Sequence, residues 1–250
     1  MRQMGPRARE HKRYHHGDLR HALIHTGLEV IDREGLQALS IRRLAAKIGV
    51  SHTAPIYHFA NKNELIGAIA TEGFRIYNRT VAPVLEEPDP RERFVGLGRR
   101  YFQFASEHSA YYRLIFGPSG DTWTTGETDE LAEESSRAFE SLLSTVAYYL
   151  QSNGVNGSKA DFEKRVRMTS IMTWAHVHGT VMLWFNDIWS FKFPGIDSTI
   201  EQHGYLAAFR PMVENTLSYL LDHLLEFATG DIADWDREPS PTHTHWAGPA

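Results

Sequence analysis

Residues 40–62 read Ser-Ile-Arg-Arg-Leu-Ala-Ala-Lys-Ile-Gly-Val-Ser-His-Thr-Ala-Pro-Ile-Tyr-His-Phe-Ala-Asn-Lys. Four apolar residues in the first part recur at the spacing of one helix face: Ile41, Leu44, Ala45 and Ile48. Ser40 stands where it can cap that helix, and Gly49 supplies the left-handed backbone that ends it. The stretch therefore predicts a short helix followed by a tight turn, with Val50 in the core beneath the turn.

A second short helix is predicted directly after that turn, with Ser51 as its cap. This helix would expose His52, Thr53 and Tyr57. Two short helices joined by a glycine turn are typical of a helix-turn-helix, whose second helix enters the major groove of DNA. DNA binding is therefore the function against which the rest of the chain is tested.

The composition is that of a globular protein with room for one large domain or two modest ones. The chain has 250 residues, of which 42% are hydrophobic, and it contains no cysteine. Disulfides and thiolate zinc sites are therefore excluded, and the composition suits a reducing cytoplasm. The sequence has no secretory signal pattern and no run of 18 apolar residues, so we expect no membrane segment.

Charge is distributed unevenly along the chain. Residues 1–62 hold 11 Lys and Arg against 5 Asp and Glu, whereas the remainder holds 15 against 26. The net charge is therefore +6 in the first part and −11 in the rest, within a total of −5. A basic head on an acidic body suits a polyanionic partner for the head alone.

The pattern predicts an all-α fold, with an N-terminal three-helix helix-turn-helix head followed by a helical bundle. We expect a flexible basic arm at 1–16, the DNA-binding head at 17–65, a regulatory and dimerisation domain at 66–229 and a disordered tail at 230–250. A first helix over about 19–34 is capped by Asp18 and ended by Gly35. Asn61 or Asn63 caps the helix after the head, and later helices are expected at about 91–107, 109–116, 129–153, 159–189 and 200–228.

The last two long helices are apolar over wide stripes, and each stripe is wide enough to be buried on two sides. Helices 159–189 and 200–228 are therefore expected to form a four-helix interface of a homodimer. Gly179 would serve a close approach of helices there. Burial of both helices inside one large monomer core is the alternative.

The chain resembles the TetR family of bacterial transcriptional regulators. The resemblance is best over about residues 14–75, and Tyr14–Arg20 and Gly49–Pro55 are similar to one subgroup. That subgroup carries a Trp-x-x-x-His-Gly (WHG) motif in its regulatory half, to which residues 174–179 are similar, and residues 111–117 resemble it too. The family usually has Tyr three residues before the Phe that is Phe59 here, but this chain has Ile56 there, which cannot donate a hydroxyl to phosphate.

Eight residues of the head are predicted to contact DNA. The first turn after Ser51, with His52 and Thr53, would read base edges, and Tyr57 could reach either a base edge or a phosphate. The remaining candidates are phosphate contacts or, for Arg42, a phosphate or base contact, and the resemblance implies the phosphate contact of Lys62. The full set is Ser40, Arg42, Ser51, His52, Thr53, Tyr57, His58 and Lys62. A solvated polar surface is the alternative for each of them.

The resemblance also implies an apolar ligand cavity in the regulatory domain, occupied by a small-molecule effector that changes the spacing of the two heads. Its candidate residues are Phe102, Phe116, Trp123, Met172, Trp174, His178 and Trp184. Ordinary core packing is the alternative, because aromatic and Met residues at helical spacing also pack well without a ligand.

Metal, cofactor and enzyme functions find little support in the sequence. His176 and His178 are two residues apart, so on a helix they point in different directions and cannot bind one ion together. No phosphate-binding glycine loop, serine-nucleophile elbow or His-Glu-x-x-His motif is present. The sequence therefore predicts a repressor that binds a palindromic operator as a dimer and is released by a small apolar ligand, without a cofactor. The alternative is an architectural DNA-binding protein of the nucleoid that senses no ligand.

Overall fold

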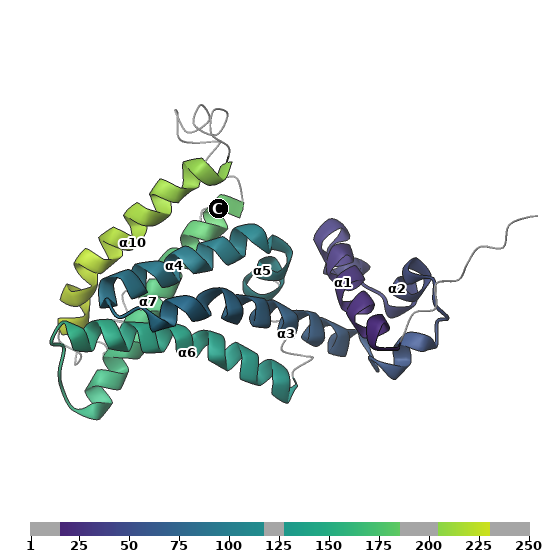
Figure 1. Cartoon of the computed structure of the whole chain (residues 1–250), viewed down its shortest axis with the longest axis horizontal. Coiled ribbons are helices and arrows are strands. Elements are labelled where there is room, and N and C mark those ends of the chain that lie inside the picture. Colours follow the sequence, from purple (N-terminus) through teal and green to yellow (C-terminus); the bar gives the residue numbers. More distant parts are fainter. Residues whose placement is uncertain (1–15, 118–127, 186–204, 231–250) are drawn as a thin grey trace, which may run out of the picture. The chain divides into compact units, whose positions relative to one another are not determined.

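The computed structural model of the chain describes residues 16–117, 128–185 and 205–230, and all regular structure in these segments is helical (Figure 1). The helices of the first half are α1 His16–Glu34, α2 Ile41–Ile48, α3 Lys62–Val81, α4 Pro90–Glu107 and α5 Ser109–Phe116, with short 3₁₀ helices η1 Leu36–Ala38, η2 Ala54–Tyr57 and η3 Ala82–Glu86. The second half contributes α6 Asp129–Ser152, α7 Lys159–Phe185 and α10 Tyr205–Thr229. The all-α prediction is confirmed. The predicted arm up to His15, the tail from 231 and Trp123 lie outside the described residues.

The chain divides into two compact units. Unit 1 comprises the described residues within Met1–Arg75 and His108–Ser135, and unit 2 those within Ile76–Glu107 and Ser136–Ala250. The boundary predicted at residue 65 falls inside α3, and the observed boundary falls later in the same helix. Leu65, Ile66 and Ile69 are fully buried, because the first half of α3 completes the core of unit 1.

Unit 1 is built on a core of aliphatic residues and one aromatic cluster. Leu23 of α1 and Leu44 of α2 have no exposed surface. The ring centroid of Phe116 in α5 lies 5.9 Å from that of Phe74, which it meets edge-on, and 5.4 Å from that of Tyr112. Arg113 of α5 forms an ion pair with Asp32 of α1. The segment that begins at His108 is therefore part of the same packed unit as the N-terminal helices.

Unit 2 is organised around the mutual packing of α4, α7 and α10 (Figure 1). A Cβ atom at Gly98 of α4 would lie 2.4 Å from Leu217 Cδ2 of α10. This glycine therefore permits the close approach of α4 and α10. Among the described residues of the protomer, nothing lies within 4 Å of a Cβ built at Gly179, so the close approach predicted for this glycine stays a prediction for a contact between subunits.

The apolar stripe of α10 is largely buried inside the protomer. Of its described members, Leu225 and Phe227 are half-buried, and the others are buried: Val213, Leu217, Leu220, Leu221 and Leu224. The large apolar side chains of α7 and α10 that remain exposed in the described segments are Ile171, Leu183 and Tyr219. The width of the stripe therefore reflects packing against both α4 and α7, which the sequence could not distinguish from a subunit contact.

Candidate nucleic-acid interface and ligand groove

The first helix of the predicted motif and its glycine turn form as expected. Gly49 ends α2 in the left-handed conformation, with φ 83° and ψ 30°. The amides of Gly49 and Val50 both donate to the carbonyl of Ala45 at 3.0 Å, which satisfies the end of the helix. Ser40 occupies the N-cap position in an extended conformation, but its side chain makes no capping hydrogen bond, so the predicted hydroxyl cap is wrong. The Ser40 hydroxyl is instead exposed.

The second helix of the motif is a correction to the sequence prediction, because η2 is a single 3₁₀ turn rather than an α-helix. Ser51 would cap an α-helix only if Pro55 could donate an amide to its carbonyl, and proline has no N–H. The Ala54 amide donates to the Ser51 carbonyl at 3.1 Å instead, and Thr53 takes the N-cap position of the turn. The Ser51 Oγ lies 3.2 Å from Thr53 Oγ1, so its side chain is not the predicted cap.

Residues 51–58, here called the recognition turn, hold their side chains in fixed directions. Pro55 is buried, and so is the Phe59 ring that follows the turn. The Pro55 carbonyl accepts hydrogen bonds from the His58 and Phe59 amides, each at 2.9 Å. These contacts anchor one side of the turn in the core. The opposite side presents the residues predicted to contact DNA.

The predicted reading residues are accessible. Ser51, His52 and Thr53 are exposed, Tyr57 is 87% exposed, and His58 is half-buried. Ile56, beside Tyr57, is 60% exposed. The recognition turn therefore offers hydroxyl, imidazole and apolar groups together on one surface.

The basic residues around the turn differ in how they are held. Arg43 is paired with Glu34 through two hydrogen bonds of 2.7 and 2.6 Å. Arg42 is exposed and has no ion-pair partner among the described residues. Lys62 is half-buried and donates its Nζ to the Leu36 carbonyl at 2.8 Å. Of the two arginines that the motif places side by side, Arg42 is therefore the one available to an anionic partner.

Asn61 is the cap of α3, as one of the two predicted alternatives. Its Oδ1 accepts from the Glu64 amide at 3.0 Å, while Glu64 Oε2 accepts from the Ala60 amide at 2.7 Å. This reciprocal pair satisfies two amides at the start of the helix. It fixes the end of the recognition turn relative to α3.

The residues predicted to line a ligand cavity do not form one group. Phe116 belongs to the aromatic cluster of unit 1. Trp184 lies 5.2 Å from Phe102 between ring centroids, and Met172 is half-buried on α7. The fold brings Trp174 and His178 together, with ring centroids 5.3 Å apart.

Tyr101 joins Trp174 and His178 into a hydrogen-bonded group, here called the Tyr101 cluster. Trp174 Nε1 donates to the Tyr101 hydroxyl at 3.3 Å, and that hydroxyl lies 3.1 Å from His178 Nδ1. Burial lowers the pKa of His178 from its ordinary value of 6.5, so the neutral imidazole is favoured. In the neutral imidazole, an unprotonated Nδ1 can accept a hydrogen bond from the Tyr101 hydroxyl. Tyr101 could not be identified from the sequence, because its two partners lie more than 70 positions away along the chain.

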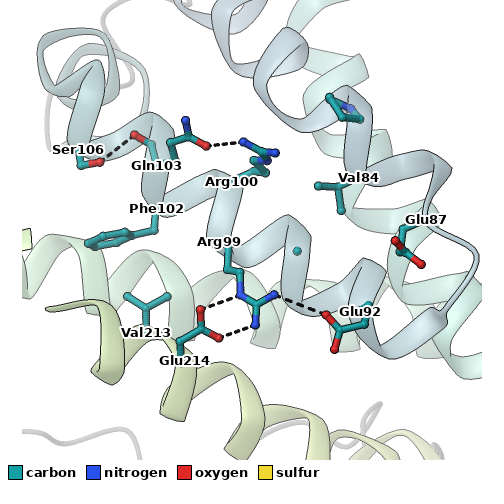
Figure 2. Close-up of a pocket in the computed structure, with 12 residues that line it drawn as sticks. Val84, Glu87, Glu92, Arg99, Arg100, Phe102, Gln103, Ser106, Val213 and Glu214 are labelled. Carbon is teal, nitrogen blue, oxygen red and sulfur yellow. Dashed lines mark hydrogen bonds and ion pairs between the residues drawn. The ribbon is translucent and has the colours of Figure 1, made fainter. Parts of the chain in front are cut away.

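A groove of about 660 Å³ opens in unit 2 between η3, α4 and α10 (Figure 2). Of the predicted ligand residues that the structure describes, only Phe102 lines it. Arg99 crosses the floor of the groove and donates from Nε and an η-nitrogen to the two carboxylate oxygens of Glu214, at 2.7 and 2.8 Å. This bonding raises the pKa of Arg99 above its usual value. The groove was missed because one wall comes from α10, where Glu214 lies 115 positions from Arg99 along the chain.

The groove has one basic group outside this ion pair. Arg100 is half-buried and donates to Gln103 Oε1 at 2.7 Å, and no described carboxylate pairs with it (Figure 2). Phe102 and Val213 supply an apolar wall, and Val84 another. The groove is therefore amphipathic, in contrast to the apolar cavity that was expected.

Two further properties concern the described residues alone. None of their helices is long and apolar enough to cross a membrane. In the same segments, no group of three His, Asp or Glu residues is arranged to hold a metal ion.

Two family models match the chain and together cover more than half of it. The model of bacterial regulatory proteins of the tetR family matches residues 23–69, and the model of the tetracyclin repressor-like C-terminal domain matches residues 94–203. The class C tetracycline repressor protein of Escherichia coli is 36% identical over 77 residues, which are 31% of this chain and 35% of that protein. The chain spans about a third of the length of the curated relatives it matches.

Solved structures share the fold over most of the chain. A protein of unknown function from Rhodococcus sp. RHA1 has a TM-score of 0.61 at 20% identity, over 86% of this chain and 97% of that one. The transcriptional regulator FadR from Bacillus subtilis, in complex with stearoyl-CoA, has a TM-score of 0.57 at 14% identity, over 83% and 98%. At such identities the likeness shows the fold alone.

Proposed function

The chain belongs to the TetR family of bacterial regulatory proteins, and on that premise we propose that it is a DNA-binding transcriptional repressor of the cytoplasm. It binds a palindromic operator as a homodimer and is released by a small-molecule effector. The observation that carries this proposal is the recognition turn, where His52, Thr53 and Tyr57 are exposed on a turn anchored by buried Pro55. Such a surface on a basic head suits contact with the edges of base pairs.

The proposed contacts divide between bases and phosphates. His52 and Thr53 read base edges, because they precede the anchored part of the turn and are exposed. Arg42, with no described ion-pair partner, contacts a phosphate or a base, and Ser40 adds its exposed hydroxyl beside the first amides of α2. Ser51, His58 and Lys62 complete the set. The Lys62 ammonium keeps two donors beyond its bond to Leu36, which suffices for a phosphate contact.

Dimerisation is proposed through α7 and α10. Ile171, Leu183 and Tyr219 are exposed large apolar side chains on these helices, which supports a further partner surface there. A twofold dimer would place two recognition turns one DNA turn apart, about 34–36 Å. Sedimentation of the full chain tests this step, and a monomer at micromolar concentration would contradict it.

The effector is proposed to bind within unit 2 and to carry both apolar and hydrogen-bonding groups. The groove combines Phe102 and Val213 with the Arg100 guanidinium, and its volume of about 660 Å³ suits a small molecule. In the core of the same unit, the hydroxyls of Thr145, Thr169 and Ser170 are buried without a described hydrogen-bond partner. FadR from Bacillus subtilis, which shares the fold, was solved with stearoyl-CoA, a ligand with such a dual character. A purely apolar effector, as expected from the sequence, would leave the Arg100 guanidinium of the groove unused.

The experiment that tests the function is selection of binding sites from a random DNA library, followed by affinity measurements on the selected duplex and on random DNA. A repressor of the proposed kind enriches one palindrome and binds it at least a thousandfold more tightly than random sequence. Uniform affinity with a steep salt dependence would instead indicate the architectural alternative. Screening small amphipathic acids for release of the selected duplex then tests the effector step.

A further inference from the structure

Ile56 and Tyr57 stand apart from every other large apolar residue in the described part of unit 1. They are 60% and 87% exposed, whereas the remaining large apolar side chains of residues 19–75, 108–117 and 128–135 are buried or half-buried. Exposure of two adjacent large apolar groups leaves surface that packing within the chain does not use. The recognition turn therefore carries an apolar feature as well as polar ones.

This exposure is built into the turn. Pro55 precedes Ile56 and Tyr57, Phe59 follows them, and both are buried. The Pro55 carbonyl accepts hydrogen bonds from the His58 and Phe59 amides, each at 2.9 Å. Arg20 covers the Phe59 ring, with its guanidinium carbon 5.4 Å from the ring centroid. Turning Ile56 inward would pull Pro55 and Phe59 out of the core, so Ile56 faces outward whether or not a partner is bound.

The two exposed residues differ in what they can do at a DNA surface. Tyr57 has a hydroxyl, which can bond to a phosphate or a base edge. The Ile56 side chain has no hydrogen-bonding group, so it cannot bond to phosphate oxygens or to the polar atoms of base edges. The apolar group that the major groove presents is the C5-methyl of thymine.

We propose that Ile56 is a specificity-determining residue that packs against the C5-methyl group of a thymine in each half-site. This inference rests on the proposed function and adds to it the identity of one base. His52 and Thr53, exposed on the same turn, supply the hydrogen bonds at neighbouring positions. The residues before Pro55 thus form hydrogen bonds to base edges, and Ile56 after it makes an apolar contact.

The test uses the full chain and the palindrome selected from a random library. Each thymine in turn is replaced by deoxyuridine, which removes only the C5-methyl group, and affinity is measured by fluorescence anisotropy. Wild-type protein is expected to lose about fourfold affinity per half-site at one symmetric thymine position, the effect of one methyl-sized group leaving an apolar contact. Ile56→Ala is expected to bind the thymine and uracil duplexes equally at that position, whereas Ile56→Val keeps part of the difference.

Two controls separate the possible results. Tyr57→Phe keeps an exposed ring of similar size and is expected to retain the uracil penalty in full. Because Ile56 is exposed, Ile56→Ala should keep the thermal midpoint of the wild type, which a melting curve establishes beforehand.

If no uracil position matters, or if Ile56→Ala shows the same penalty as the wild type, the inference is overturned. A uniform loss of affinity in Ile56→Ala, without a uracil effect, would place Ile56 on the sugar backbone and overturns it as well. Failure of the proposed function is distinct, because the library would then enrich no sequence.

Discussion

The recognition turn of unit 1 and the Tyr101 cluster of unit 2 use the same kinds of side chain in opposite ways. In the turn, His52 and Thr53 are exposed, and the hydroxyl contact of Thr53 is to its neighbour Ser51. In the Tyr101 cluster, the hydroxyl of buried Tyr101 is engaged by both Trp174 and His178. The polar groups of the turn lie at the surface, whereas the interior polar groups of the cluster bond to each other. The side chains of the recognition turn are therefore accessible to an external partner, whereas those of the Tyr101 cluster are already engaged within the protein.

The largest effect is expected from removing the exposed polar side chains of the recognition turn. Replacing His52 and Thr53 together with Ala should lower affinity for the selected palindrome by roughly ten- to a hundredfold, because hydrogen bonds to base edges are lost. Binding to random DNA should change far less, since phosphate contacts remain. Anisotropy titrations on both duplexes measure the two effects. An equal loss on the palindrome and on random DNA would mean that these residues do not read bases.

The second prediction concerns two helical glycines of unit 2. Gly98→Ala should lower the free energy of unfolding by about 1–3 kcal/mol, because the new Cβ overlaps the buried Leu217 side chain. Gly179→Ala is the matched control, since nothing lies within 4 Å of its added Cβ. That variant should gain up to about 1 kcal/mol from helix propensity. Denaturant titration of both compares them, and equal effects would show that the packing of α4 on α10 is not tight.

A smaller effect is expected from removing the hydroxyl that joins the Tyr101 cluster. Tyr101→Phe should cost about 1 kcal/mol of stability, because the Trp174 Nε1–H and His178 Nδ1 lose their common partner. Tyr148→Phe removes a hydrogen bond of 2.7 Å to the Pro88 carbonyl at an exposed position and should cost less. Thermal unfolding of the two variants measures the difference. A larger loss in Tyr148→Phe would contradict the importance of the cluster.

The smallest effect is a pH dependence from His178. Burial lowers the pKa of His178 in the folded state, so between that pKa and the ordinary value of 6.5 the unfolded chain binds the proton more readily. The stabilising contribution is therefore present above pH 6.5 and is lost as the pH falls below it. His178→Gln should show a shallower fall in stability between pH 7.5 and 5.5 than the wild type. Parallel slopes for the two proteins would show that His178 is not the group responsible.

Much of the head could be predicted from sequence because its signals are local. The end of the first helix at Gly49 requires a left-handed residue, and the structure confirms that conformation. The second short helix predicted after Ser51 forms as a single 3₁₀ turn, and the proline that lacks an amide, Pro55, stands in the sequence. Whether that loss shifts the local hydrogen bonds to 3₁₀ spacing depends on how Pro55 and Phe59 pack.

The sequence by itself determined the helical class and the glycine turn, because periodicity and backbone chirality act over a few residues, and its motifs carried the resemblance to the TetR family. Only the tertiary structure decided that Gly98 brings helices together within the protomer, and that Tyr101 meets Trp174 and His178. It also decided that Arg100 and Phe102 share a groove with Val213 of α10. These features join segments that are distant along the chain, and their geometry is set by how side chains fill the space between helices. Sequence and tertiary structure together decide which side chains the recognition turn exposes. The sequence supplies the residues, and the burial of Pro55 and Phe59 fixes their outward direction.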